Sequence, residues 1–217
     1  MKANRKVKTI AGRLVRELER KLPQEHAYVP QLDLFRKVLQ QQRSDRHKIY
    51  SLHEPQVQCI SKGKEHKKYE FGNKVSILYT QTTGVIVGAL AFNNEYDGHT
   101  LEGALEQYGR LKDKLPENIY ADRGYKEKTK IEDTNIHIPK PFSKKLNQYQ
   151  QQKRKKSHRR RAAIEPVIGH LKQDHRLSRN FYKGNFGDAI NVLLAAAAFN
   201  FKRMMNRYKN VFVRIFL

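Results

Sequence analysis

Hydrophobic residues recur at helical spacing near both ends of the chain. A repeat of about four residues predicts an amphipathic helix over Met1–Leu22 and a second helix over Leu32–Gln41. A strongly apolar run predicts a helix over Ala189–Met205. A hydrophobic tail, Val211–Leu217, follows it, and its pattern predicts no particular structure.

Between these ends the pattern changes repeatedly from strand to helix. Runs rich in β-branched and aromatic residues predict two strands, Glu70–Thr80 and Val85–Phe92, joined as a hairpin by the turn residues between them. A short strand is also predicted before them, at Ile49–Leu52. After the hairpin, the predicted elements are a helix at Thr100–Leu111, a strand at Asn118–Ala121, a helix at Gly124–Ile131 and a strand around Ile136 and Ile138. Strands that alternate with helices predict an α/β fold, in which helices cover a sheet.

The stretch Ser157–Arg176 places apolar and charged residues on two faces of one predicted helix. The apolar residues fall at i, i+3, i+4 and i+7, and they are Ile164, Val167, Ile168 and Leu171. Arg161, Glu165 and Lys172 follow a second line, rotated by roughly 90° because each residue turns the helix by about 100°. A carboxylate would therefore lie at the edge of a buried core, between two cations. Pro166 has no N–H to donate, so it suits the first turn of this helix.

A second carboxylate, Asp122, directly follows the short predicted strand Asn118–Ala121 and precedes Gly124. A carboxylate at a strand end and another at a helix start can converge on one metal site. A charged residue beside an apolar stripe is, however, more often part of a solvated helix edge. The pattern alone leaves both interpretations open.

The net charge of the chain indicates which class of molecule it binds. Its 217 residues include 44 Lys and Arg against 21 Asp and Glu, which gives a formal net charge of +23. Such an excess predicts an anionic polymer as partner, nucleic acid first and an acidic membrane second. Lys144–Arg161 alone holds nine Lys or Arg among eighteen residues. This run is interpreted either as a solvated linker or as a contact to the DNA backbone.

Membrane insertion and disulfide bonding are not expected. No apolar run approaches the roughly 20 residues that span a bilayer, and the basic residues Met1–Lys8 are not followed by the apolar stretch of a signal peptide. Cys59 is the single cysteine, so an intrachain disulfide is impossible and a reducing cytoplasm fits.

Four sequence blocks resemble the catalytic domain of bacterial insertion-sequence transposases of the DDE type, most closely the group named for insertion sequence five. The blocks are KIYSLHEPQVQCISKGKEHKKYEFGNKVSI, NEYDGHTL, IYADRGY and RRRAAIEPVIGHLKQDHRL. The wider family carries a signature of four residues, in which Tyr is followed after two residues by Arg, after three more by Glu and after six more by Lys. Arg161, Glu165 and Lys172 hold the last three places, whereas His158 stands at the place of the Tyr.

The resemblance implies an RNase H-like mixed sheet flanked by helices at residues 48–210, after a helical segment at 1–47 and before a tail at 211–217. It implies metal-dependent cleavage and strand transfer of double-stranded DNA, at the terminal repeats of an element and at a target. The implied cofactor is Mg²⁺ or Mn²⁺, held by Asp122 and Glu165 as catalytic carboxylates. Phosphate contacts are expected from Arg161, Lys172, His158, Arg159, Arg160, Lys153, Arg154, Lys155 and Lys156. The resemblance also allows a homodimer.

One departure from the family concerns its first metal-binding carboxylate, which stands on a first strand that has no counterpart here. We therefore expect an N-terminally truncated transposase whose sheet lacks that strand or is closed imperfectly by Ile49–Leu52. Glu54 is the strongest substitute ligand in the sequence. The alternative hypothesis is a non-catalytic DNA-binding remnant, or an inhibitor of the full-length transposase.

Overall fold

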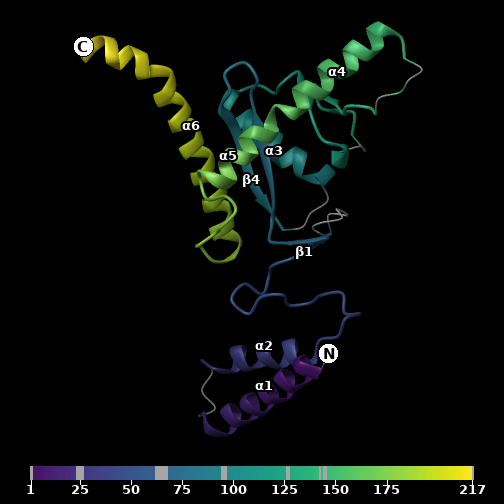
Figure 1. Cartoon of the computed structure of the whole chain (residues 1–217), viewed down its shortest axis with the longest axis vertical. Coiled ribbons are helices and arrows are strands. Elements are labelled where there is room, and N and C mark those ends of the chain that lie inside the picture. The colour runs from purple at the N-terminus through teal and green to yellow at the C-terminus, as the bar shows by residue number, and fades with distance from the viewer. Residues whose placement is uncertain are drawn as a thin grey trace. The chain divides into compact units, whose positions relative to one another are not determined.

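The computed structural model describes residues 2–22, 27–61, 68–93, 97–125, 128–141, 143 and 146–216. The chain divides into two compact units, Met1–Gly72 and Asn73–Leu217 (Figure 1). Both candidate carboxylates, Asp122 and Glu165, belong to the second unit. The domain limits expected from the sequence, 48 and 210, stay a prediction.

The first unit contains two helices and a small strand pair. Helices α1 (Lys2–Lys21) and α2 (Val29–Gln40) confirm the two predicted helices, and they pack against each other with Val15 buried. Strands β1 (Cys59–Ser61) and β2 (Tyr69–Phe71) pair antiparallel.

The strand predicted at Ile49–Leu52 is wrong. The side-chain amide of Gln41 donates to the carbonyl of Ile49 and accepts from its N–H, both at 3.0 Å. A side chain thus satisfies the backbone groups that a neighbouring strand would otherwise have paired.

A hairpin opens the second unit. Strands β3 (Lys74–Tyr79) and β4 (Ile86–Phe92) pair antiparallel, which confirms the predicted hairpin with a shorter first strand. The sequence predicts that this first strand begins at Glu70, but Glu70 belongs to β2. Gly72, between β2 and β3, has a φ of +128°. Because an L side chain rarely adopts that φ, the glycine breaks the strand in two.

The second sheet holds three strands. Strand β5 (Asn118–Tyr120) lies parallel to β7 (Thr134–His137), and β6 (Lys130–Ile131) lies antiparallel to β7 on its other side. The helix predicted at Gly124–Ile131 is wrong at both ends, since Gly124 and Tyr125 belong to a 3₁₀ turn (η1, Arg123–Tyr125) and Lys130 and Ile131 form β6; residues 126 and 127 lie outside the described residues. Pairing of this segment with β7 overrides its helical pattern. Among the described residues no strand joins this sheet to the β3–β4 hairpin.

Helix α3 (Asp97–Lys112) confirms the predicted helix and contacts both sheets. Its Leu101 and Leu105 form a core with Ala121 and Ile136 of the second sheet. It also packs against β3 and β4. The position of Asp122 relative to the hairpin is therefore set through α3.

The single helix predicted over Ser157–Arg176 is two helices, α4 (Gln148–Ala162) and α5 (Ile164–Gln173), separated at Ala163. The break has a local cause. Pro166 has no N–H for the carbonyl of Ala162, and its ring crowds that carbonyl. As predicted, Pro166 lies in the first turn of the helix that follows.

The last helix, α6 (Gly184–Phe216), begins before the predicted start and takes in the predicted tail as far as residue 216. One face of α6 packs with α5 against the hairpin, and the buried residues of this core are Ile86, Ala89, Val167, Leu171, Val192, Ala195 and Ala196. The amide of Asn200 accepts from the N–H of Ile86 at 2.9 Å and donates to its carbonyl at 2.8 Å. No helix in the described part of the chain is long and apolar enough to cross a membrane.

Candidate functional site

One guanidinium connects the two carboxylates that the sequence singles out. Arg161 donates from Nη2 to Oδ2 of Asp122 at 2.9 Å and from Nη1 to Oε1 of Glu165. Arg161 and Asp122 are 39 positions apart in the sequence. The side chains of Asp122 and Glu165 remain 62% and 58% exposed, so solvent reaches both carboxylates.

Asp122 is positioned by the parallel pairing of β5 with β7. The N–H of the buried Ala121 donates to the carbonyl of His137 at 3.0 Å, which extends the pairing to the residue before Asp122. The chain then turns into η1, where Oδ1 of Asp122 accepts from the N–H of Arg123 at 2.7 Å. One carboxylate oxygen is thus held by backbone and the other by Arg161.

Glu165 and Arg161 occupy favourable ends of consecutive helices. Glu165 lies in the first turn of α5 and Arg161 in the last turn of α4. Helix dipoles favour an anion at the first place and a cation at the second. The buried Val167 and Leu171 anchor α5 to the hairpin core, so Glu165 stands at the edge of that core.

Helix α4 is fastened to both sheets beside this site. Arg160 donates to the hydroxyl of Tyr120 on β5 and lies 5.1 Å from the centre of its ring. The Tyr120 ring stacks in turn on His137 of β7, 5.0 Å between centres. On the other side, Gln81 of the hairpin turn donates to the carbonyl of Arg160 at 2.8 Å. Sequence reasoning missed Tyr120, His137 and Gln81, because only the tertiary contacts of α4 reveal their part.

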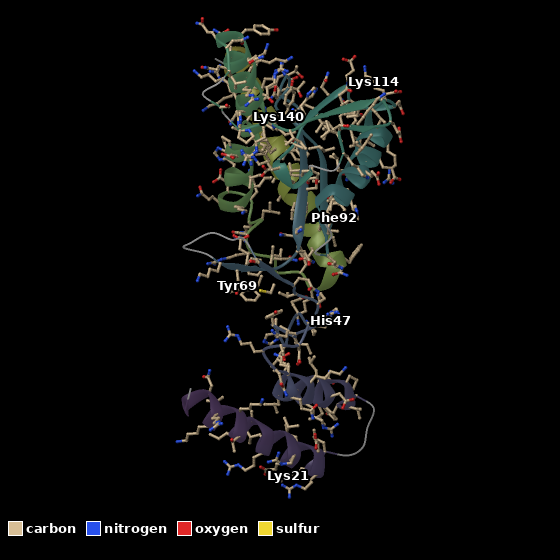
Figure 2. All side chains as sticks on the ribbon, turned by 90° about the vertical axis from the view of Figure 1, so that its right-hand side faces the viewer. Lys21, His47, Tyr69, Phe92, Lys114 and Lys140 are labelled. Carbon is tan, nitrogen blue, oxygen red and sulfur yellow. The ribbon has the colours of Figure 1, made fainter. Side chains whose placement is uncertain are left out.

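The basic residues predicted to contact phosphates fall into two groups. Three hold α4 in place: Arg160 as described, His158 through the carbonyl of Lys140 at 2.9 Å, and Arg154 through the carbonyl of Pro141. Apart from Arg161, which bonds the two carboxylates, the others are exposed, and they are Lys153, Lys155, Lys156 and Arg159 on α4 and Lys172 on α5. Figure 2 shows nitrogen-tipped side chains projecting from α4. The part of this run within Gln148–Ala162 belongs to the regular helix α4, in which seven of fifteen residues are Lys or Arg, whereas Lys144 and Lys145 lie outside the described residues.

A cavity of about 320 Å³ opens beside the carboxylate of Asp122. Its lining consists of Asp122, Arg123, Pro139, His158 and Arg161. Three of these five residues carry nitrogen donors, so the cavity suits an anionic group next to the carboxylate.

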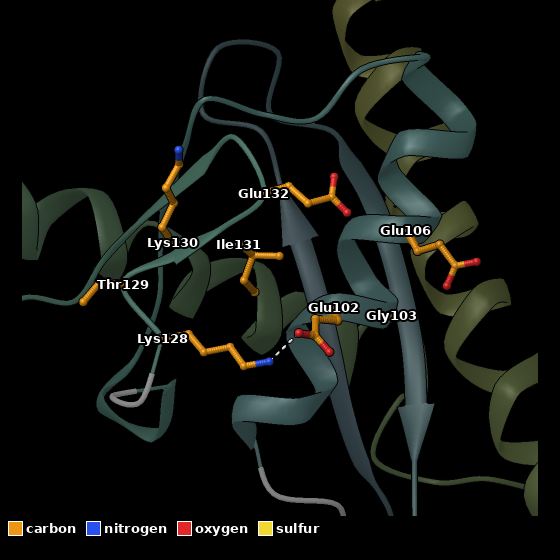
Figure 3. A pocket seen from close by; sticks show the side chains of 8 residues that line it. All are labelled: Glu102, Gly103, Glu106, Lys128, Thr129, Lys130, Ile131 and Glu132. Carbon is orange, nitrogen blue, oxygen red and sulfur yellow. Dashed lines mark hydrogen bonds and ion pairs between the residues drawn. The ribbon is translucent and has the colours of Figure 1, made fainter.

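A larger cavity, about 690 Å³, lies between α3 and β6, and none of the predicted site residues lines it (Figure 3). Lys128 pairs with Glu102 across it, and this contact holds the pKa of the Glu102 carboxyl below its usual range. Glu106 and Glu132 also line it.

The donor set of Asp122 and Glu165 fits one hard divalent cation. Mg²⁺ is commonly bound by one or two carboxylates, with water and phosphate oxygens as its other ligands. Both carboxylates bond the same guanidinium, so the Arg161 side chain lies between them in the structure. Within the described residues no cluster of three His, Cys, Asp or Glu has metal-binding geometry. Glu54, the sequence-based substitute, belongs to the first unit, where it accepts from the side chain of Gln56.

The family model described as a transposase DDE domain matches residues 37–201. No curated protein and no solved structure matches the chain.

Proposed function

This chain belongs to the family of transposase DDE domains, and we propose that Asp122 and Glu165 are two of the metal-binding carboxylates of its DNA-cleaving site. The observation that carries the proposal is the Arg161 guanidinium, which bonds a carboxylate from the end of β5 and another from the start of α5. Two carboxylates, an arginine and a basic helix are groups that metal-dependent phosphodiester chemistry on DNA uses.

Asp122 and Glu165 would hold the divalent cation, Mg²⁺ or Mn²⁺. When bound, such an ion supplies Lewis-acid stabilisation of the charge that develops on phosphate oxygens. Arg161 lies close enough to contact the same phosphate, since its planar fork binds either carboxylate or phosphate oxygens. In the structure the fork is occupied by the two carboxylates.

The exposed cations of α4, with Lys172 of α5, would contact the DNA backbone on either side of this site. Lys153, Lys155, Lys156 and Arg159 project from a helix that Arg160 and Arg154 fasten to the protein. A rigid helix presents its charges with less loss of side-chain and backbone freedom than a loop would.

We propose further that the fold is RNase H-like, of the group of insertion sequence five, and that the strand with the first carboxylate is not among the described residues. Two observations support this. The β3–β4 hairpin and the β5–β7–β6 sheet are not joined by a described strand, and no third carboxylate of the described residues joins Asp122 and Glu165. Strands β3 and β5 each have one edge on which no described strand pairs, which is where an added strand would bind.

The test is a cleavage assay on a duplex that carries an element end, with Mn²⁺ present. The chain alone should bind the duplex and fail to cut it. Adding a separate polypeptide that contains a strand ending in Asp should restore cutting, and Glu165→Gln or Asp122→Asn should abolish it. Binding without cutting in every combination would favour the alternative, a DNA-binding remnant or inhibitor. Robust cutting by the chain alone that is lost in Glu54→Gln would place the first carboxylate at Glu54.

A homodimer through α6 is the arrangement we propose for the protein. On the face opposite the hairpin core, exposed residues follow a 4-3-4-3 spacing, and they are Leu194, Ala198, Phe201, Met205 and Tyr208. That spacing is the heptad pattern of paired helices. Sedimentation should show a weak, concentration-dependent dimer that Phe201→Glu abolishes and Leu111→Glu, an exposed leucine of α3, does not. A monomer at all concentrations would contradict the proposal.

A further inference from the structure

Three aromatic rings project from the segment that connects α5 to α6 and from the first turn of α6, which begins at Gly184. Phe181 and Phe186 are 73% and 79% exposed, and Tyr182 between them is half exposed. Exposed aromatic rings leave much apolar surface in water, so a group of three within six residues indicates a binding surface. We call Arg176–Phe186 the aromatic turn.

The aromatic turn is held in one conformation by hydrogen bonds. The Asp188 carboxylate accepts from the side-chain amide of Asn180 at 2.6 Å and from that of Asn73, the residue before β3. Oδ1 of Asn180 accepts from the N–H of Tyr182 at 2.9 Å. The N–H of Leu177 donates to the carbonyl of Leu171 at 2.9 Å, which ties the start of the turn to the buried end of α5.

Glycine is required in the first turn of α6, where it packs against Tyr182. A Cβ added to Gly187 would lie 2.7 Å from Cβ of Tyr182 and 2.8 Å from its carbonyl carbon, closer than real side chains approach. The backbones of Tyr182 and Gly187 can therefore pack together only without that Cβ. The rings are presented by an ordered turn, and this order lowers the entropy cost of binding.

Cations accompany the rings. The Arg176 guanidinium lies 5.9 Å from the centre of the Phe181 ring, and Arg179 and Lys183 are exposed on the same turn. The sequence from His175 to Gly187 contains no Asp or Glu. The surface therefore complements a ligand that combines flat apolar faces with negative charge.

We propose that the aromatic turn stacks on unpaired bases of single-stranded DNA, with its Arg and Lys side chains on the flanking phosphates. Bases in an intact duplex cover one another's faces, so exposed rings can stack only on bases that have left the duplex. This inference rests on the proposed function, because strand cleavage and transfer expose such bases at DNA ends. The ring faces bind any base, so we expect little sequence preference.

The test compares single-stranded with duplex DNA. Fluorescence anisotropy should be measured with a labelled oligothymidine and with a duplex of equal length, for the whole chain and for Phe181→Leu and Phe186→Leu. Leucine keeps the apolar character but has no aromatic face. Single-strand affinity should fall between about fivefold and about a hundredfold for each ring removed, while duplex affinity stays within about twofold. Phe71→Leu, at an exposed phenylalanine of β2, is the matched control and should change neither.

A second readout reports stacking directly. The sequence contains no tryptophan, so Phe181→Trp introduces the single tryptophan of the chain. Oligothymidine should quench its fluorescence, and the duplex should not. Unchanged fluorescence with bound oligothymidine, or leucine variants that bind single strands normally, would overturn the inference. Either result with intact duplex binding leaves the proposed function standing, whereas loss of all DNA binding in the unaltered chain would overturn both.

Discussion

Replacing Arg161 by alanine should tighten the binding of a divalent cation in the absence of DNA. In the structure the guanidinium bonds both carboxylates, 2.9 Å from Asp122 and in direct contact with Glu165. A metal ion that takes both carboxylates must displace this cation or accept its repulsion. Arg161 and the metal therefore compete for the same oxygens.

The size of the effect follows from exposure. Because both carboxylates are more than half exposed, each ion pair with Arg161 contributes at most about 1 kcal/mol, as surface pairs do. In the unaltered chain a bound metal ion displaces two such pairs, which costs about 1–2 kcal/mol of its binding free energy. Arg161→Ala removes this cost and should lower the Kd for Mn²⁺ by about tenfold. The difference should shrink at high ionic strength, since salt screens exposed charges.

Calorimetric titration with Mn²⁺ measures this affinity directly. Arg160→Ala is the matched control. It removes the same positive charge at the neighbouring position, from a side chain that bonds Tyr120 instead of the two carboxylates. That variant should bind Mn²⁺ within about twofold of the unaltered chain. Unchanged or weaker Mn²⁺ binding in Arg161→Ala would refute the competition between Arg161 and the metal. Asp122→Asn should abolish binding in both backgrounds.

Three further predictions concern stability and DNA binding. Leu171→Ala removes a fully buried side chain and should cost about 3 kcal/mol in urea unfolding, whereas the exposed Leu111→Ala should cost less than about 0.5 kcal/mol. Duplex affinity should fall linearly on a log–log plot against salt, and the Lys155→Ala, Lys156→Ala double variant should reduce the slope by about 2 if each lysine contacts one phosphate. Burial lowers the pKa of His175 in the folded chain below 6.5. As the pH drops through about 6.5 the unfolded chain therefore binds a proton before the folded chain does, and the free energy of unfolding should fall. His175→Gln should flatten that pH dependence of the melting temperature; an unchanged dependence would count against the burial of this imidazole.

The histidine prediction depends on several neighbours. His175 packs edge-on against Phe199 at 6.2 Å, and its pKa is further lowered by Lys202 and His170 and raised by Asp174. Nε2 of His175 is buried without a hydrogen-bond partner in the described structure. Protonation would add a charge at this buried atom, which explains the direction of the shift.

The sequence by itself determined the features whose signal is local. Helices α1, α2 and α3 appear at their predicted places, because the spacing of their apolar residues reports directly which helix face is buried. Pro166 likewise marked the first turn of α5 through its own covalent geometry. The spacing of Arg161 and Glu165 placed an ion pair on one helix face, and the pair persists across the break at Ala163.

Only the tertiary structure decided what depends on residues far apart in the chain. Whether Lys130 and Ile131 join a helix or a strand was settled by pairing with β7, which the local pattern does not encode. The sequence of the basic run does not show whether α4 is solvated or docked on the protein. The contacts of Arg160 with Tyr120 and Gln81 show that it is docked. The bond from Arg161 to Asp122 spans 39 positions, and no periodicity within one helix can report a contact to a strand end. This bond forms because α3 packs against both sheets and α5 packs against the hairpin, which together bring the end of β5 near the start of α5. Such packing is a property of the whole unit.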